Sequence, residues 1–150
     1  QTLYGARDRL GIKPFYYFWD GRTFAFASEI KALLEHPALS AEPQDDLLAE
    51  YLCFGYVSEE RTLFRNIRKL MPGHHLTLRC RQGRLELNIE RYWDVPQPQL
   101  YPGRSDAEWV SAVRQGLEET VRMRLMADVP LGTFLSGGLD SSSVLSLARR

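Results

Sequence analysis

The chain is poor in cysteine, in long hydrophobic runs and in net charge. Its two cysteines, Cys53 and Cys80, are too few for a disulfide scaffold and too isolated for a zinc site. A reduced, cytoplasmic setting is therefore expected. No run approaches the roughly 18 apolar residues that would suggest a transmembrane helix, and the first residues show no signal-peptide pattern. Lys and Arg number 19, as do Asp and Glu, so no basic field favours nucleic acid.

The composition that remains is that of a folded protein. The 150 residues are 44% hydrophobic and 11% aromatic, which is enough to bury a core. Both ends look interrupted, because residues 3–6 resemble a strand already under way and residues 142–150 a helix that no Gly or Asn stops. We therefore expect the chain to be the middle of a longer protein.

Two hairpins are predicted in the first 94 residues. Aromatic and apolar runs flank Asp20-Gly21, where glycine can adopt the positive φ that a type I′ turn needs. Leucines alternate with polar residues on either side of a second turn at residues 81–84. Ser28 suits the N-cap of a short helix that Pro37 stops, and another helix is expected from about Asp45. Residues 1–94 are thus predicted to be an α+β domain with its strands in a meander, or the C-terminal part of such a domain.

A change of composition predicts a second domain. Residues 95–104 contain three prolines and a glycine, which is typical of a linker. Ser105 and Glu108 then form a capping-box pattern, followed by apolar residues at helical spacing through Val121. A short apolar strand is predicted at residues 131–135, before a glycine-rich turn and another helix. Residues 105–150 therefore predict the start of a parallel α/β sheet.

The turn from residue 136 to residue 142 is the segment most informative about chemistry. Two glycines would let an anion approach the backbone closely, and the following helix would direct its free N–H groups and positive dipole end to the same place. The serines add hydroxyl donors. Asp140 is the acid in this cradle, and a carboxylate beside phosphates is best explained by a shared Mg²⁺ ion. The loop lacks the Gly-Lys-Ser/Thr of a Walker A motif and the three-glycine dinucleotide fingerprint.

The same motif carries a family resemblance. Ser-Gly-Gly-Leu-Asp-Ser-Ser at residues 136–142 resembles the pyrophosphate loop of the N-type ATP pyrophosphatases. With residues 122–135 before it, the segment resembles the start of the synthetase domain of glutamine-hydrolysing asparagine synthetases. Residues 6–17, 26–33 and 67–74, together with Tyr92-Trp93, resemble the later part of a class II glutamine amidotransferase domain, in the order of that family.

The resemblance implies an architecture and a reaction. Residues 1–94 would be the C-terminal part of an αββα amidotransferase domain of the N-terminal-nucleophile type. Residues 95–104 would be a linker, and residues 105–150 the N-terminal part of an α/β ATP pyrophosphatase domain. The enzyme would be a ligase that uses ATP to adenylate aspartate to β-aspartyl-AMP and then amidates it with ammonia from glutamine. Asparagine, AMP, pyrophosphate and glutamate would be released.

The site residues implied by the resemblance all lie at the loop. ATP would bind to Leu135, Ser136, Gly137, Gly138, Asp140, Ser141 and Ser142, with Asp140 also holding Mg²⁺. No catalytic residue can be assigned, because the family's nucleophilic cysteine and glutamine-binding residues have no counterpart here, and the isolated chain is expected to be inactive. ATP, aspartate and glutamine would be its small-molecule partners, with no nucleic acid or membrane, and a homodimer is left open.

Other readings of the sequence stay open. A relative that amidates another carboxylate or closes a β-lactam would share the loop, and a non-catalytic interaction module is a third alternative. Arg7 and Asp8 are expected to brace a loop rather than to take part in chemistry. His74 and His75 are expected to be turn or surface residues. Cys53 and Cys80 are expected to be small buried packing residues.

Overall fold

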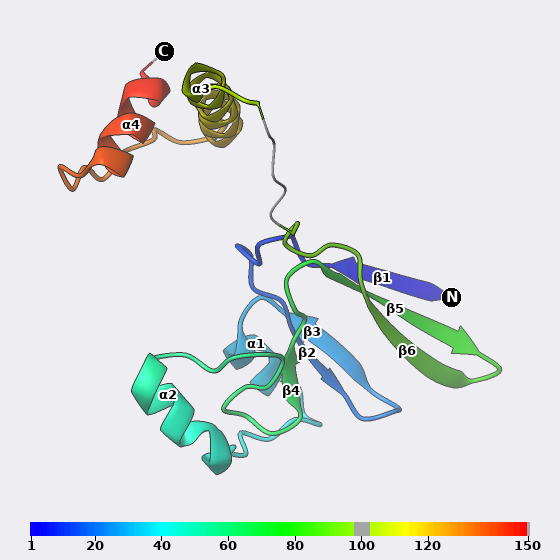
Figure 1. Cartoon of the computed structure of the whole chain (residues 1–150). Coiled ribbons are helices and arrows are strands. Elements are labelled where there is room, and N and C mark those ends of the chain that lie inside the picture. Colours follow the sequence, from blue (N-terminus) through cyan, green and yellow to red (C-terminus); the bar gives the residue numbers. More distant parts are fainter. Residues whose placement is uncertain (98–102, 150) are drawn as a thin grey trace. The chain divides into compact units, whose positions relative to one another are not determined.

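The computed structural model describes residues 1–97 and 103–149, which belong to two compact units, Gln1–Pro96 and Gln97–Arg150 (Figure 1). The boundary between Pro96 and Gln97 falls inside the linker expected at residues 95–104. Residues 98–102 of that linker lie outside the described residues.

Unit 1 contains two three-stranded antiparallel sheets. The first has the order β1-β5-β6 and the second the order β3-β2-β4. The strands are β1 (Thr2–Ala6), β2 (Tyr16–Trp19), β3 (Phe24–Ala27), β4 (Ile67–Lys69), β5 (His74–Arg81) and β6 (Arg84–Arg91). Both predicted hairpins are confirmed as β2–β3 and β5–β6. The expected meander is incomplete, because β5 also pairs with β1 and β2 also pairs with β4. These contacts between distant segments leave no local signal in the sequence.

The two hairpin turns differ from the prediction in their geometry. At the first, only Gly21 has a positive φ, of 93°, and the strands end at the pair Trp19 and Phe24, so a type I′ turn at Asp20-Gly21 is wrong. The Asp20 carboxylate instead accepts hydrogen bonds from the amides of Arg22 and Thr23, which stabilises a longer loop. The two positive φ angles of a type I′ turn occur at Gln82 and Gly83, with 50° and 76°.

Short helices accompany the second sheet in unit 1. Helix α1 (Ile30–Leu34) begins after Glu29 rather than after Ser28, and no side chain caps it. The second predicted helix is a 3-10 turn, η1 (Asp45–Leu47), continued by α2 (Leu48–Phe54). Gly55 ends α2 in the left-handed conformation, with φ 76°.

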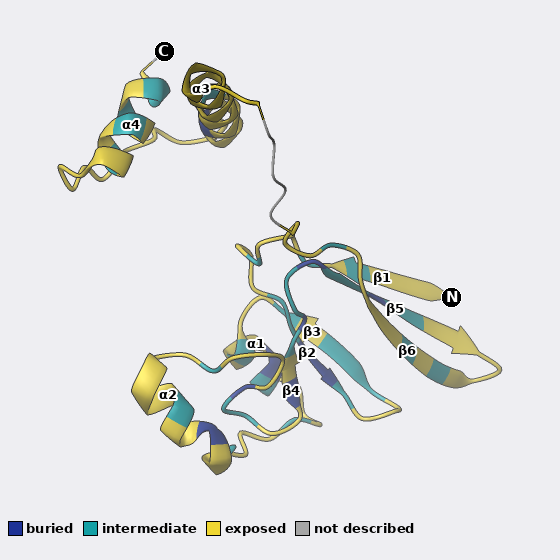
Figure 2. Ribbon diagram, viewed as in Figure 1, coloured by how far each residue is buried: buried dark blue, intermediate teal, exposed yellow. Residues whose placement is uncertain are grey.

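The core of unit 1 lies where the two sheets and the segment before β5 meet. Tyr17, Leu70 and Leu76 are at most 2% exposed and form one cluster. The partly buried side chains around it are those of Phe15, Trp19, Phe24 and Leu87. Full burial of such side chains stabilises a fold by roughly 1.5–3 kcal/mol each. Figure 2 shows the buried stretches on β2, β4 and β5. Unit 1 is therefore a mixed helix and strand fold with its own core.

Unit 2 consists of two described helices, α3 (Asp106–Arg124) and α4 (Leu139–Ala148). The predicted capping box is confirmed, because the Ser105 hydroxyl accepts from the Glu108 amide and the Glu108 carboxylate accepts from the Ser105 amide. Donation from the Ser105 amide, together with that from the Ser105 hydroxyl, lowers the pKa of Glu108. The described part of the chain contains no helix that is long and apolar enough to cross a membrane.

The strand predicted at residues 131–135 is wrong. These residues form irregular backbone, and Phe134 is 101% exposed. A strand needs a neighbouring strand for its N–H and C=O groups, and the described residues of unit 2 contain none. The expected start of a parallel α/β sheet is thus represented here only by its helices.

Candidate phosphate-binding site

The loop before α4 has the backbone that its glycines permit. Gly137 lies in the left-handed region, with φ 80°, which favours glycine. Gly138 is the N-cap of α4, with φ −76° and ψ 165°, a conformation open to any residue. Gly138 therefore matters for the space that its missing side chain leaves open, not for its backbone conformation. Asp140 lies in the first turn of α4, not in the turn itself as expected.

The first turn of α4 presents unused backbone donors. No side chain caps this helix, and the amides of Leu139, Asp140 and Ser141 have no acceptor within residues 103–149. The first intrahelical bond of this end runs from the Ser142 amide to the Gly138 carbonyl, at 3.1 Å. Three free N–H groups at the positive end of a ten-residue helix form a place where an anion is stabilised.

The loop hydroxyls mainly hold the loop itself together. The hydroxyls of Ser136 and Ser141 lie 3.0 Å apart, and that of Ser141 also donates to the Gly138 carbonyl at 3.2 Å. Ser136 accepts from the Gly138 amide at 3.4 Å. From the sequence, these hydroxyls were expected to donate to a ligand, whereas in the structure they hold the turn in its shape. The Ser142 hydroxyl makes no hydrogen bond with the described residues, so it is available to a ligand.

Asp140 is exposed and its carboxylate makes no hydrogen bond or ion pair with any described residue. It does not cap α4, since that helix has no side-chain cap bond. Its proximity to the helix N-terminus is favourable by charge alone. Within residues 1–97 and 103–149 there is no group of three or more His, Cys, Asp or Glu side chains suited to a metal ion. Asp140 could therefore be one ligand of a hydrated cation but does not form a site alone.

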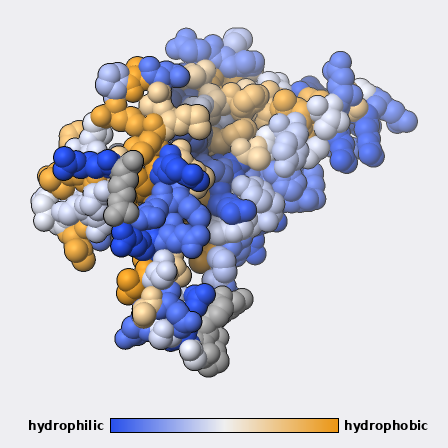
Figure 3. Space-filling model, turned by 90° about the horizontal axis from the view of Figure 1, so that it is seen from above, coloured by the Kyte–Doolittle hydropathy of each residue, from blue (hydrophilic) through white to orange (hydrophobic). Residues whose placement is uncertain are grey.

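Apolar side chains flank the loop. Leu135 is 54% exposed and Leu139 is 84% exposed. More generally, Figure 3 shows hydrophobic residues, coloured orange, among hydrophilic ones on the face of the molecule that it presents. An exposed leucine next to free amides could contact the apolar face of a ligand whose anionic group the amides bind.

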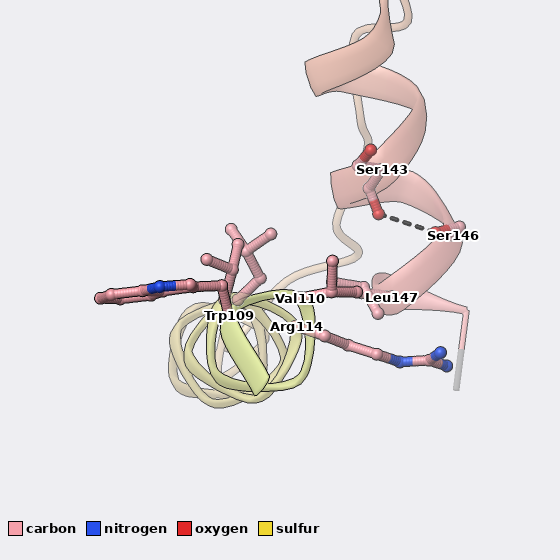
Figure 4. A pocket seen from close by; sticks show the side chains of 8 residues that line it. Trp109, Val110, Arg114, Ser143, Ser146 and Leu147 are labelled. Atoms are coloured by element: carbon pink, nitrogen blue, oxygen red, sulfur yellow. Dashed lines mark hydrogen bonds between the residues drawn. The ribbon is translucent and has the colours of Figure 1, made fainter. Parts of the chain in front are cut away.

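A groove between α3 and α4 was not predicted. It has a volume of about 580 Å³ (Figure 4). The lining residues are Trp109, Val110, Val113, Arg114 and Leu117 from α3 and Ser143, Ser146 and Leu147 from α4. The three- and four-residue spacing of apolar residues predicted the apolar face of α3, but the sequence could not indicate that this face would border an open groove.

The expected brace at Arg7 and Asp8 is confirmed. The Arg7 guanidinium donates to the carbonyls of Gly11, Lys13 and Leu70, at 3.0, 2.9 and 2.7 Å. The Asp8 carboxylate accepts from the amides of Lys13 and Ile12, and these donors lower its pKa.

The expected environments of the histidines and cysteines are only partly confirmed. Nδ1 of His74 lies 2.8 Å from the Pro72 carbonyl oxygen, as suits a turn residue. His75 is less exposed than expected, and its buried Nδ1 has no hydrogen-bond partner among the described residues. Burial of Cys53 and Cys80 is wrong, since both are exposed free thiols. Cys53 lies on α2, which buries none of its residues, and Cys80 lies near the tip of the β5–β6 hairpin.

Unit 1 holds a further feature that the sequence analysis missed. A cavity of about 430 Å³ is lined by residues of α2, of β4 and of the segment between them, together with Tyr16 of β2 and Ile30 of α1. Lys69 borders it and donates to the Val57 carbonyl oxygen. Burial lowers the pKa of Lys69. This lysine ties the segment after α2 to β4, a role that only the fold reveals.

Two family models match the chain. The glutamine amidotransferase domain matches residues 1–93, and asparagine synthase matches residues 112–150. The second match includes the loop before α4.

Curated relatives match nearly the whole chain. "Asparagine synthetase [glutamine-hydrolyzing] 3" of Bacillus subtilis is 42% identical over 97% of this chain and 23% of its own length. "Asparagine synthetase [glutamine-hydrolyzing] 1" of the same organism is 35% identical over 99% and 22%. "Amidase chyE" of Penicillium rubens is 37% identical over 98% and 21%. The chain thus spans less than a quarter of the length of these relatives.

Proposed function

The chain belongs to the glutamine-hydrolysing asparagine synthetase family, and from this we propose that the full-length protein forms asparagine from aspartate, ATP and glutamine. Residues 1–94 are assigned to the end of the glutaminase domain, of the N-terminal-nucleophile type. Residues 105–150 are assigned to the start of the α/β ATP pyrophosphatase domain, with residues 95–104 as the linker. The enzyme is a carbon–nitrogen ligase of amino-acid biosynthesis.

The observation that carries the ATP-binding role is the unused donor set before and within α4. Three free amides, a glycine in the left-handed conformation and an unpartnered carboxylate occur within residues 137–141. Free amides occur at the start of any helix, so the ATP-binding role rests on their combination here with the glycine turn and the unpartnered carboxylate. They suit the pyrophosphate group of ATP, which presents several anionic oxygens at once.

In the proposed reaction an aspartate carboxylate oxygen attacks the α-phosphorus of ATP, and the bond to the β-phosphate bridging oxygen breaks. Pyrophosphate leaves, and ammonia then displaces AMP to give asparagine. The amides of residues 139–141 would bind and orient the departing pyrophosphate, with Ser136 and Ser141 keeping the turn in shape and Ser142 adding a donor. Leu135 would border the nucleotide. Mg²⁺, held in part by Asp140, would supply charge neutralisation.

No catalytic residue is assigned because the chain covers only part of the length of its relatives. The family's nucleophilic cysteine and glutamine-binding residues have no counterpart in these residues, and the chain spans 23% of the first relative's length. We therefore expect the 150 residues alone to be inactive in both half reactions. The reduced cytoplasm is the proposed compartment, on the basis of the sparse cysteine alone. A homodimer stays an open proposal.

A second candidate function is favoured by one comparison. A protein named as an amidase is 37% identical to this chain, close to the identity of the synthetases. The acceptor carboxylate of this enzyme could therefore differ from aspartate while the loop is retained. A cysteine directly after the initiator methionine of the full-length protein would favour glutamine hydrolysis. Its absence would favour the β-lactam-forming or other amide-forming relatives.

The loop is tested by Gly138→Val in the full-length protein. The φ of Gly138 is accessible to valine and an added Cβ would meet only the Ser136 hydroxyl, at 3.5 Å, so the fold should survive. The branched side chain would obstruct the approach of phosphate. With Mg-ATP at 100 times its dissociation constant, the wild type should gain about 2.7 kcal/mol of stability and the variant much less.

Gly116→Val is the matched control, because Gly116 lies on α3 with open space around it. This control should keep the full ATP-dependent increase in melting temperature. If Gly138→Val also keeps it, the loop does not bind ATP and the proposed function loses its structural support. If wild type itself shows no response to Mg-ATP, the non-catalytic module becomes the better reading.

A further inference from the structure

The cavity of unit 1 has the size of a small-molecule site. Its volume of about 430 Å³ lies within the range of roughly 300–1,000 Å³ that is usual for ligand pockets. Residues of α1, α2, β2 and β4, and of the segment between α2 and β4, line it, so it lies wholly within unit 1. We call it the tyrosine cavity. Its aromatic and cationic lining residues are Tyr16, Tyr51, Tyr56, Phe64, Arg61 and Lys69.

The three tyrosines of the lining are open to a ligand. Tyr16 belongs to β2 and Tyr51 to α2, and Tyr56 follows α2. Tyr51 and Tyr56 remain 42% and 62% exposed, and the hydroxyls of all three make no hydrogen bond with the described residues. A tyrosine offers an apolar ring face and a polar edge at the same time. The lining therefore suits a planar aromatic group.

The charged side chains of the lining are all cationic. Among the described residues, Arg61 and Lys69 line the cavity and no carboxylate does. Arg61 is paired with Asp46, so its charge is compensated. Lys69 forms no ion pair with any described residue and donates one hydrogen to the Val57 carbonyl oxygen. Because an ammonium group has three N–H donors, two of them are left for a ligand.

The surroundings of Lys69 leave its charge uncompensated. Burial lowers the pKa of the Lys69 ammonium, the charge of Arg7 lowers it further, and Glu50 acts in the opposite direction. The Glu50 carboxylate is itself engaged by the Ser58 amide, at 2.6 Å. A partly buried cation without a counter-charge is stabilised when an anion binds beside it. The polar part of a ligand favoured by this cavity is therefore an anionic group at Lys69.

We propose that the tyrosine cavity binds a small aromatic monoanion, with its ring against the tyrosine side chains and its anionic group at the Lys69 ammonium. One unpaired cation matches one negative charge. A cationic ligand is repelled by the two positive side chains, and a neutral ring leaves Lys69 without a counter-charge. The cavity shares no residue with the loop before α4, so this site does not depend on the proposed ATP binding.

The test measures protection of Lys69 from acetylation in the full-length protein. Naphthoate is the probe. Its uncharged amide tests the need for charge, and acetate tests the need for a ring. N-acetoxysuccinimide acetylates neutral amines, and mass spectrometry of the peptides gives the rate at each lysine. Lys31 is the internal control, because it is exposed and its ammonium lies 2.7 Å from the Glu29 carboxylate.

Naphthoate should protect Lys69 selectively. At about ten times its dissociation constant it should slow acetylation of Lys69 roughly tenfold, because it covers the amine and favours the charged form. The amide and acetate, at the same concentration, should slow it by less than about twofold. Acetylation of Lys31 should not change with any of the three compounds.

Two pairs of variants separate the ring from the charge. Tyr56→Ala removes part of the aromatic lining and should weaken naphthoate binding roughly two- to tenfold. Tyr4→Ala is its matched control, because Tyr4 is 64% exposed and does not line the cavity. Lys69→Gln should weaken binding, measured by equilibrium dialysis, roughly tenfold, whereas Lys31→Gln should leave it unchanged. Protection of the wild type needs no variant, so it decides the question even if a variant fails to fold.

Four results overturn the proposal. Absence of protection by naphthoate means that the cavity binds no such ligand. Equal protection by naphthoate and its amide means that charge is not recognised, and equal protection by naphthoate and acetate means that the ring is not. If Lys69 is acetylated in the 150-residue chain but not in the full-length protein, other residues of the enzyme fill the cavity. The response of the melting temperature to Mg-ATP tests the proposed function separately.

Discussion

Unit 1 and unit 2 differ in how they use their apolar residues. Unit 1 buries Tyr17, Leu70 and Leu76 almost completely between its sheets, whereas Val121 is the sole buried residue among the described part of unit 2. In Figure 2 the ribbons of α3 and α4 are mostly exposed. Apolar content alone therefore does not tell whether a segment encloses its own core.

The contrast has its origin in the distances over which contacts form. In unit 1, β1 pairs with β5 and β2 with β4, so segments far apart in sequence close around the same side chains. In unit 2 the helices are stabilised by local bonds such as the capping box and the Arg114–Glu118 pair. Local bonds form helices, but burial of an apolar face requires a second surface.

The largest difference is expected from truncation of apolar residues. Leu76 is 0% exposed and Val113 is 59% exposed. In the 150-residue chain, Leu76→Ala should lower the free energy of unfolding of unit 1 by about 2–5 kcal/mol, through lost burial and a cavity. Val113→Ala should change stability by less than about 0.5 kcal/mol. Urea unfolding followed by tryptophan fluorescence measures both, and equal losses would mean that the groove of unit 2 is covered in solution.

A smaller effect is expected where unit 2 depends on local bonds. Ser105→Ala removes the side chain that caps α3 and should cost about 0.5–2 kcal/mol of helix stability. The Ser111 hydroxyl, in the same helix, makes no hydrogen bond with the described residues, so Ser111→Ala should be neutral or slightly favourable. Thermal loss of the helical circular dichroism signal compares them. A harmless Ser105→Ala would show that α3 is stabilised by packing instead.

The smallest effect on stability is expected at two aspartates, Asp8 in unit 1 and Asp140 in unit 2. Amides of Lys13 and Ile12 hold the pKa of Asp8 below its ordinary value of 3.8. The ionised Asp8 therefore stabilises the fold fully above the unfolded value, and this contribution disappears as the pH falls through the lower folded pKa. Asp8→Asn should lower the urea midpoint at pH 7 and lose part of the acid sensitivity.

Asp140→Asn serves as the counterpart of Asp8→Asn. The carboxylate of Asp140 has no partner among the described residues, so its replacement should change the free energy of unfolding by no more than about 0.5 kcal/mol. In the full-length protein, Asp140→Asn should nevertheless lower ATP-dependent synthesis roughly a hundredfold and spare glutamine hydrolysis. If Asp140→Asn lowered the stability of the protein but left synthesis normal, Asp140 would have a structural role and not the proposed role in ATP binding.

Much of the local structure was predictable from short patterns. The hairpins, the capping box of α3 and the helix after Gly138 follow from alternation, capping residues and turn residues. The strand expected at residues 131–135 failed because an apolar run becomes a strand only beside a partner. The type I′ geometry failed at Asp20 because the aspartate side chain formed its own turn.

The sequence by itself determined the family, the linker composition and the residues of the loop before α4, to which we assign phosphate binding, because these are encoded in contiguous stretches. The tertiary structure alone decided which donors of that loop are free, that Asp140 caps no helix, and that Gly73 must be a glycine. Free donors and close backbone approaches depend on where distant segments meet in space, as Gly73 meets Trp93. That placement is set by packing and hydrogen bonding across the chain and leaves no periodic signal in the order of the residues.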